Sequence, residues 1–397
     1  MICNGPLELP IISAMRVRTL VMAVAIVVTA VGCPKGKAHE PTPDLFRPSG
    51  VYQVGNSPTF LATADFNGDK VPDLVTANIN GQNVSVLLGL GDGTFAERVR
   101  YRVGELPRML VATDLTQDGV SDLVVINNGS NSLSILKNRG DGTFEDAVHR
   151  PVGQSPLALT AGDFNGDGLV DVAVCLRFDH LVILLGDGMG GFRDGEVFDP
   201  GDTPASVVAA DFNRDNRVDL AVANSGSMKG NVAIFLGDGA GHFALAGEYG
   251  NHIRPIYMTM GDFNGDGNAD LVETDGPRNL LTMFLGKGDG GFEQGQGFAA
   301  ESGPVFIAPG DFTRDGRLDV AVTNTVSNSL SVVVGNGDGS FRFPPFDYQT
   351  DRGPFAAVAT DLNADGVLDV AVAHFQSENV AVWLGRGDEE LRAKKTG

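Results

Sequence analysis

The sequence has few cysteines and few basic residues. Its 397 residues include three cysteines, Cys3, Cys33 and Cys175, whose number and wide spacing exclude a disulfide framework and a cysteine-based zinc site. Lysine and arginine total 29 against 50 aspartates and glutamates, which gives a net charge of −21. Because phosphate binding needs a basic face, this balance argues against a nucleic-acid partner and suits the binding of cations.

Long apolar runs are also lacking. The longest run, residues 20–31, has twelve residues, which is the length of a secretory h-region and too short to span a bilayer. It follows Arg16 and Arg18, and the more natural start is Met15, which places these arginines at the beginning. We therefore predict a signal peptide within residues 1–32 and an exported protein.

Cys33 directly follows the predicted signal peptide. Small residues before a cysteine resemble the bacterial lipoprotein signal, in which the cysteine is lipidated, although Ala30 stands where that family usually has leucine. Residues 33–45 are polar and proline-rich, which indicates a flexible tether. We predict lipidation at Cys33 and anchoring to a membrane of the bacterial cell envelope, at the outer membrane or cell surface. The alternative is an ordinary cleaved signal and a periplasmic or secreted protein.

The abundant residue is glycine, and it belongs to an internal repeat. The 53 glycines indicate many tight turns, and one ten-residue pattern of the form DFNGDGxxDL recurs seven times. Successive copies lie 48–51 residues apart, and a G-x-F hairpin signature follows each of the first six. The copies begin at Asp65, Asp114, Asp163, Asp211, Asp262, Asp311 and Asp361.

The segments between these landmarks have the pattern of short strands. Each repeat of about 49 residues holds four apolar or alternating runs bounded by Gly, Asn, Asp and Pro, with no helical period. Four strands per repeat predict a blade of an all-β, seven-bladed β-propeller over residues 46–391, followed by a tail at 392–397. An open solenoid is the alternative.

The two ends of the repeat region favour a closed ring. The seventh repeat has Leu391 in place of the hairpin phenylalanine and no fourth strand after it. Residues 46–58 match the fourth-strand stretch of the first repeat, with Phe46 aligned to Phe95 and Pro58 to Pro107. We therefore expect the N-terminal segment to complete the last blade, an exchange that removes two free sheet edges.

The repeated loop carries the chemistry of a calcium site. Counted from its first aspartate, positions one, five and nine are aspartate in all seven copies, and position three is Asn or Thr. Calcium takes six to eight oxygen ligands, and these side chains converge if the backbone turns sharply near position six, which also directs the carbonyl of position seven to the ion. A bare turn is the alternative for any single loop. The predicted ligands are, loop by loop, Asp65, Asn67, Asp69, Val71 and Asp73; Asp114, Thr116, Asp118, Val120 and Asp122; Asp163, Asn165, Asp167, Leu169 and Asp171; Asp211, Asn213, Asp215, Arg217 and Asp219; Asp262, Asn264, Asp266, Asn268 and Asp270; Asp311, Thr313, Asp315, Arg317 and Asp319; and Asp361, Asn363, Asp365, Val367 and Asp369.

The loops are not equivalent. Thr116 and Thr313 replace asparagine at position three, while Lys70 and Asn216 replace the glycine at position six. Lys70 adds strain and a positive charge. We therefore expect up to seven Ca²⁺ ions, with loops three, five and seven binding most tightly.

These loops and their register resemble the FG-GAP/VCBS repeats of the integrin α-chain propeller and of many exported bacterial proteins. The resemblance covers residues 46–391 and implies that each calcium loop joins the first and second strands of a blade. Its members have diverse functions, among them adhesion, sugar binding and attachment to polysaccharide-degrading enzymes, so the resemblance does not give the ligand.

The variable loops between the second and third strands are candidates for ligand contact. In repeat three, Arg177, Phe178, Asp179 and His180 replace the usual Asn, Ser and Gly, and an aromatic residue with polar neighbours suits a sugar or peptide. His374 and Phe375 occupy the same place in repeat seven. The alternative is that these loops simply pack differently.

Catalytic motifs are missing from the sequence. The six histidines share no repeat position, and no G-x-S-x-G, H-E-x-x-H or phosphate-binding glycine loop occurs. The sequence favours a monomeric, non-catalytic calcium-binding module that binds a protein or glycan at the cell envelope, for adhesion or as a scaffold. A calcium-dependent polysaccharide lyase or hydrolase that uses the propeller channel is the alternative.

Overall fold

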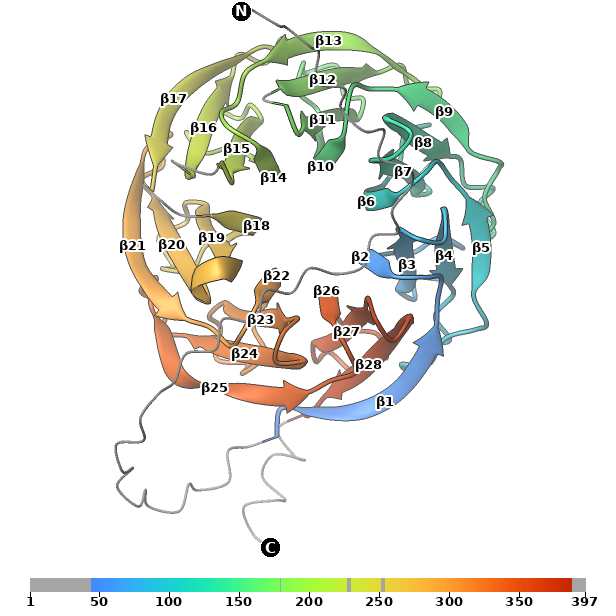
Figure 1. The fold of residues 1–397 in the computed structure, drawn as a ribbon, viewed down its shortest axis with the longest axis vertical. Coiled ribbons are helices and arrows are strands. Elements are labelled where there is room, and N and C mark those ends of the chain that lie inside the picture. Colours follow the sequence, from blue (N-terminus) through green and yellow to red (C-terminus); the bar gives the residue numbers. More distant parts are fainter. Residues whose placement is uncertain (1–43, 179, 227–229, 251–253, 388–397) are drawn as a thin grey trace, which may run out of the picture. The chain divides into compact units, whose positions relative to one another are not determined.

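The computed structural model describes residues 44–387, apart from 179, 227–229 and 251–253. The predicted signal peptide, Cys33, most of the tether, Leu391 and the C-terminal tail lie outside these residues. The described residues form seven sheets of four antiparallel strands arranged in a ring (Figure 1). This confirms the seven-bladed β-propeller and excludes the open solenoid.

Each blade is one sheet whose strands follow the chain from the centre of the ring outward. The first three blades are β2 (Pro58–Ala64), β3 (Asp73–Asn78), β4 (Asn83–Leu87) and β5 (Val99–Arg102); β6 (Pro107–Thr113), β7 (Asp122–Asn127), β8 (Ser132–Leu136) and β9 (Val148–Pro151); and β10 (Pro156–Gly162), β11 (Asp171–Leu176), β12 (His180–Gly186) and β13 (Phe192–Phe198).

The next three blades follow the same order. They are β14 (Pro204–Ala210), β15 (Asp219–Asn224), β16 (Asn231–Gly237) and β17 (Phe243–Tyr249); β18 (Pro255–Gly261), β19 (Asp270–Asp275), β20 (Leu280–Gly286) and β21 (Phe292–Ala299); and β22 (Pro304–Gly310), β23 (Asp319–Asn324), β24 (Ser329–Gly335) and β25 (Phe341–Gln349). A 3-10 turn, η1 (Gly276–Arg278), joins β19 to β20. No helix of the described part is long and apolar enough to cross a membrane.

The seventh blade is built from both ends of the ring. β26 (Pro354–Thr360), β27 (Asp369–His374) and β28 (Asn379–Gly385) are completed by β1 (Phe46–Gln53), which pairs with β28 in antiparallel register (Figure 1). The prediction that the N-terminal strand closes the last blade is therefore confirmed. The closure pairs the edge of β28 that would otherwise be free and gives this blade four strands like the others.

The core lies between neighbouring blades. All six residues of every second strand, such as β3 and β11, are buried, because both faces of that strand pack against adjacent sheets. Cys175 in β11 is completely buried, as its apolar surroundings predict. In blades one, three, four and five the phenylalanine at loop position two packs edge-to-face on the hairpin phenylalanine of the next blade, with ring centroids 5.4 Å apart for Phe66 and Phe144.

The same aromatic contact closes the ring. Phe46 in β1 packs on Phe312 of blade six, with ring centroids 5.7 Å apart, and so takes the place of the hairpin phenylalanine that blade seven lacks. Other blade junctions have a backbone hydrogen bond beside the aromatic contact. Between blades one and two, Gly142 donates its N–H to the Phe66 carbonyl at 2.9 Å. Loops one, three, four and five are attached to the next blade by this backbone bond.

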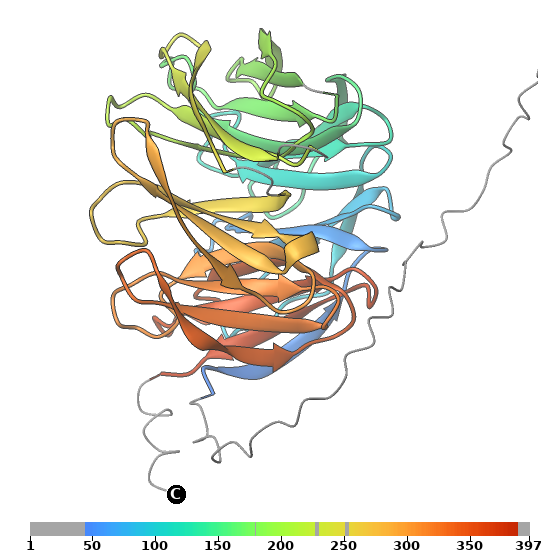
Figure 2. The same cartoon turned by 60° about the vertical axis from the view of Figure 1, so that its left-hand side comes forward.

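Antiparallel strands place the connecting loops on two opposite faces (Figure 2). The loop face carries the seven aspartate-rich loops and the G-x-F hairpins. The mouth face carries the turns between second and third strands and the G-x-x-P turns that lead to the next blade. These two names are used below.

Candidate functional site

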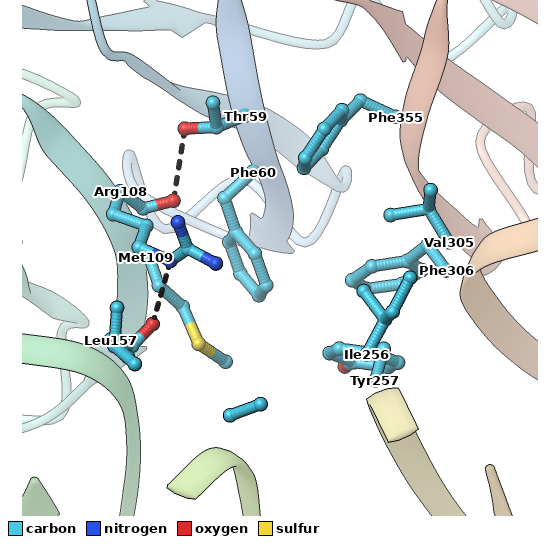
Figure 3. Close-up of a pocket in the computed structure, with 11 residues that line it drawn as sticks. Thr59, Phe60, Arg108, Met109, Leu157, Ile256, Tyr257, Val305, Phe306 and Phe355 are labelled. Carbon is cyan, nitrogen blue, oxygen red and sulfur yellow. Dashed lines mark hydrogen bonds between the residues drawn. The ribbon is translucent and has the colours of Figure 1, made fainter. Parts of the chain in front are cut away.

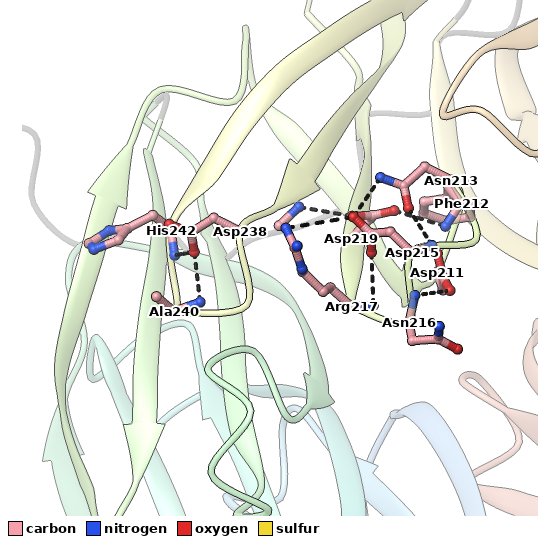
Figure 4. A network of polar contacts seen from close by, with 11 residues as sticks. Asp211, Phe212, Asn213, Asp215, Asn216, Arg217, Asp219, Asp238, Ala240 and His242 are labelled. Carbon is pink, nitrogen blue, oxygen red and sulfur yellow. Dashed lines mark hydrogen bonds and ion pairs between the residues drawn. The ribbon is translucent and has the colours of Figure 1, made fainter.

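The aspartate-rich loops join the first and second strands of every blade, as the resemblance implies. Figure 4 shows loop four, in which Asp211, Asn213 and Asp215 lie around a tight turn and Asp219 begins β15. The hairpin that holds Asp238 lies beside this loop. In each blade the predicted ligand positions thus lie within one segment of nine residues on the loop face.

The aspartate at position nine is buried and connects the loop to the hairpin of its own blade. In blade one, Asp73 accepts the N–H of Phe66 at 2.8 Å and that of Gly89 at 2.7 Å. Blade three repeats the pair, since Asp171 accepts from Phe164 at 2.9 Å and from Gly186 at 2.7 Å. This structural role accounts for an aspartate at position nine independently of any metal, and the sequence analysis did not detect it.

Burial raises the pKa of the position-nine carboxyl groups, to about 6 at Asp73, Asp270 and Asp369. The charges at positions five and one add to this increase, whereas the two backbone hydrogen bonds oppose it. The three carboxylates of a loop are therefore near enough to repel one another, and a cation among them would remove that repulsion.

Positions one and five accept hydrogen bonds within their own loop. Asp65 accepts the N–H groups of Gly68 at 2.7 Å and Lys70 at 2.8 Å, and Asp69 accepts that of Val71 at 2.8 Å. These bonds wind the nine residues into a compact turn. A carboxylate has about four lone-pair sites, so acceptance of one or two N–H groups leaves capacity for a further ligand.

Two backbone positions of the loop are left-handed. Position six was expected to be so, and Lys70 and Asn216 have φ values of 66° and 64° there. Position four is left-handed as well, with Gln117, Arg214 and Arg314 at φ values of 59°, 62° and 58°. The sequence signal for position four is glycine in three of the seven loops and no β-branched residue in the other four.

The Asn and Thr loops differ at position three. The Asn67 amide donates to Asp69 at position five at 2.9 Å, and the asparagines of loops three, four, five and seven do the same. Thr313 instead donates its hydroxyl to Asp319 at position nine, at 3.1 Å. The threonine oxygen is thus directed to the buried carboxylate and not to the exposed one.

The donor set of each loop consists of oxygen atoms alone, which fits a hard cation such as calcium. Among the described residues, however, no three Asp, Glu, His or Cys side chains stand close enough together to hold a metal ion as they are placed. Their oxygens face the N–H groups of the loop and the hairpin instead. The chemistry of the loop therefore fits calcium, and binding remains a prediction.

The proposed ligand residues on the mouth face have different environments. Arg177, Phe178 and His180 are exposed around the β11–β12 turn, while Asp179 lies outside the described residues. His374 is completely buried at the end of β27, so its predicted contact with a surface ligand is wrong. The second strands of four other blades end on a buried asparagine at the position that His374 holds in β27. Phe375 is half-buried and packs near Phe355, with ring centroids 5.9 Å apart.

Aromatic side chains narrow the mouth of the channel (Figure 3). Tyr257 and Phe306 are stacked with ring centroids 3.9 Å apart, and Phe60 meets Phe306 edge-to-face at 5.7 Å. Behind them the channel widens to a cavity of about 510 Å³ lined by the innermost strands. The lining residues are mainly aliphatic, with Thr63, Thr160 and Thr259 among the polar ones.

The residue after the proline that begins the first strand of each blade lines this mouth. The seven residues are Thr59, Arg108, Leu157, Ala205, Ile256, Val305 and Phe355. The sequence analysis did not identify them, although their fixed place after the proline is a usable signal. Their chemistry changes from blade to blade, from arginine and threonine to aliphatic residues and phenylalanine.

A closed ring of seven four-stranded blades with aspartate-rich loops between first and second strands defines a repeat propeller. The sequence profile described as FG-GAP-like repeat matches residues 114–174, 163–222, 214–273, 262–322 and 311–372. The chain therefore belongs to the FG-GAP-like repeat family. No curated protein matches the chain in sequence.

Similar solved structures support the fold alone. Crystal structures of BBS1N in complex with ARL6DN, soaked with lead in one case and with mercury in another, each align with a TM-score of 0.63. Each alignment covers 87% of this chain and 99% of the other at 9% sequence identity. The ring architecture is shared with those propellers.

Proposed function

We propose that this protein is an exported, non-catalytic calcium-binding propeller that serves as a binding or scaffold module at the bacterial cell envelope. The observation that carries the calcium proposal is the repeated loop, with three carboxylates and an Asn or Thr oxygen in nine residues, present seven times on one face. In each loop the side chains at positions one, three, five and nine and the carbonyl at position seven would hold the ion. Calcium would neutralise charges that otherwise repel.

The calcium would also stabilise the ring. In loops one, three, four and five the carbonyl at position two accepts an N–H from the hairpin of the next blade, as between Gly241 and Phe164 at 3.0 Å. A loop fixed by an ion therefore fixes the neighbouring blade. Extracellular calcium modules have dissociation constants of about 0.1–1 mM, so 10 mM calcium would contribute about 1.4–2.7 kcal/mol per occupied loop.

Calcium removal tests this proposal. The full-length protein, purified in detergent, should contain several calcium ions by elemental analysis, and exhaustive chelation should lower its melting temperature by at least 10 °C. The variant Asp365→Ala, which changes an exposed carboxylate of loop seven, should lower the stoichiometry by one ion. An unchanged melting temperature together with an absence of bound calcium would contradict the proposal.

The tether at Cys33 is proposed from sequence alone and needs its own test. The variant Cys33→Ser cannot be lipidated and should move from the membrane fraction to the soluble periplasmic or secreted fraction. The control is the wild-type protein, whose N-terminal peptide should carry the mass of the lipid. A Cys33→Ser variant that stays in the membrane fraction contradicts the lipid anchor.

The binding role is favoured over the lyase or hydrolase role by the channel. Its lining in the described residues is mainly aliphatic and aromatic, and it contains no Asp, Glu, His or Lys. Acid–base catalysis would need such a pair near a bound substrate. The fold is also compatible with binding of a protein, as in the similar propeller crystallised with ARL6DN.

A further inference from the structure

Three arginines meet in a pocket on the mouth face, beside the aromatic channel mouth. The pocket has a volume of about 390 Å³ and is lined by Arg108, Arg177 and Arg254 together with the hydroxyl-bearing Thr203 and Ser225. Arg108 follows the proline that begins β6, Arg177 begins the β11–β12 turn, and Arg254 precedes β18. The cluster is thus assembled from blades two, three and five.

The guanidinium groups of these arginines form no ion pair with a carboxylate within the described part of the chain, although the backbone N–H of Arg254 donates to Asp275 at 3.0 Å. The ion pairs of that part involve other arginines, although acidic residues outnumber basic ones in the sequence. Two carboxylates near the pocket have other partners, since Asp275 pairs with Arg278 at 3.5 Å and Asp202 accepts the Thr203 hydroxyl at 3.0 Å. Positive charge therefore gathers locally on a strongly acidic protein.

Arg108 is the centre of this cluster. Its Nε donates to the Leu157 carbonyl at 3.0 Å, which fixes the guanidinium (Figure 3). Burial, together with the charge of Arg177, lowers the pKa of Arg108. Because a poorly hydrated cation without a counter-charge is unfavourable, an anion at this place would be stabilised by several charge-assisted hydrogen bonds.

The aromatic mouth adjoins the arginine pocket. Arg108, Leu157, Ala205 and Ile256 line both cavities, so a ligand held by the arginines also reaches the aromatic mouth. The volume suits one or two sugar units. A sugar ring offers an apolar face for the aromatic and aliphatic surface and hydroxyls for Thr203 and Ser225, whereas its carboxylate suits the planar forks of arginine.

We propose that this pocket binds the carboxylate of a uronic-acid sugar, presented at the end of an acidic glycan. The inference deepens the proposed binding function and rests on it. It gives the mouth face a ligand of defined charge, while the loop face binds cations.

Binding of a defined uronic-acid trisaccharide to the calcium-loaded full-length protein tests the inference. Calorimetric titration should show at least tenfold preference for trigalacturonate over the carboxyl-reduced trisaccharide, and the affinity should fall as salt is added. The variants Arg177→Ser and Arg254→Ser should each lower the affinity by at least fivefold. Arg102→Ser, which removes an exposed arginine of β5 outside the pocket lining, is the matched control and should leave affinity unchanged.

Several results would overturn the inference. These are equal binding of the reduced trisaccharide, full affinity in both arginine variants, and equal binding of triglutamate or inorganic sulfate, which would indicate an unselective anion site. Calcium content and melting temperature measured on the same samples separate this result from the calcium proposal. If the protein is stabilised by calcium but does not bind trigalacturonate, the uronate site is rejected and the calcium proposal stands.

Discussion

The second strand of each blade runs from the loop face to the mouth face, and its two ends follow different rules. Its first residue is aspartate in all seven blades. Its last residue is Asn78, Asn127, Leu176, Asn224, Asp275, Asn324 or His374. Both ends are buried, so burial alone does not explain the difference.

The difference between the two ends is explained by the number of hydrogen-bond partners that are the same in every blade. The aspartate at the loop end satisfies two buried N–H groups in every blade, and no other residue has the length and the two acceptors to do so. The asparagine at the mouth end donates its side-chain amide to third-strand residues that differ between blades, such as Asn83 in blade one and Ser134 in blade two. Residues with the same hydrogen-bond partners in every blade are repeated, whereas residues whose partners differ between blades vary.

Removal of the aspartate at the loop end should have the largest effect. In Asp171→Ala the N–H groups of Phe164 and Gly186 lose their acceptor in a buried site, which should cost about 4 kcal/mol of unfolding free energy. Urea denaturation in excess chelator measures this cost without any contribution from calcium. Asp167→Ala at the exposed position five is the control and should cost less than 1 kcal/mol in chelator. Equal losses would show that position nine has no structural role of its own.

The sequence was sufficient to predict the ring because each blade repeats one pattern at a fixed spacing. The exchange of the N-terminal strand followed from the match between residues 46–58 and the fourth-strand stretch of repeat one. The place of the loops between first and second strands followed from the resemblance. Each of these features depends on neighbours within one repeat or on the alignment of repeats.

The arginine pocket could not be predicted in this way. Arg108, Arg177 and Arg254 occupy three different positions of their repeats, so aligned repeats do not bring them together. Only the closed ring places them around one cavity. The burial of His374 was also missed, because its place in the sequence suggested a turn, whereas β27 extends through it.

The middle of the second strand also contains a residue that departs from the repeat. Glu273 in β19 is completely buried where other blades have valine or Thr76, and burial raises the pKa of its carboxyl to about 8, with the charge of Asp275 adding to the increase. The folded protein therefore holds a proton that the unfolded chain releases near pH 4.5. Stability from this group is lost as the pH rises from about 4.5 to 8.

Glu273→Val should thus stabilise the protein, by on the order of 2 kcal/mol at pH 8 and far less at pH 5. Denaturation curves of both proteins at a series of pH values measure the difference. Glu301→Val, at an exposed position of the β21–β22 connection, is the control and should show no such dependence. A difference that does not grow with pH would mean that the buried carboxyl is not protonated in the folded protein.

Replacement at the mouth end should have the smallest effect. His374 is buried, and this burial lowers its pKa from 6.5 to about 4. Between these two pH values the histidine is therefore neutral in the folded protein and protonated in the unfolded chain. Stability from the neutral histidine is present above pH 6.5 and is lost as the pH falls towards 4. His374→Asn removes this loss of stability at low pH. The side-chain amide of the new asparagine can donate to Asn379, as Asn78 donates to Asn83 at 2.9 Å.

We expect His374→Asn to be about 1 kcal/mol more stable than the wild type at pH 7 and to gain further below pH 6. Thermal denaturation between pH 5 and 8 measures both effects, and His180→Asn at an exposed site is the control. The same variant should bind trigalacturonate as the wild type does, because His374 lies outside the lining of the arginine pocket. A loss of stability at every pH would show that blade seven has packed specifically around histidine, and that divergence at the mouth end is already compensated by its neighbours.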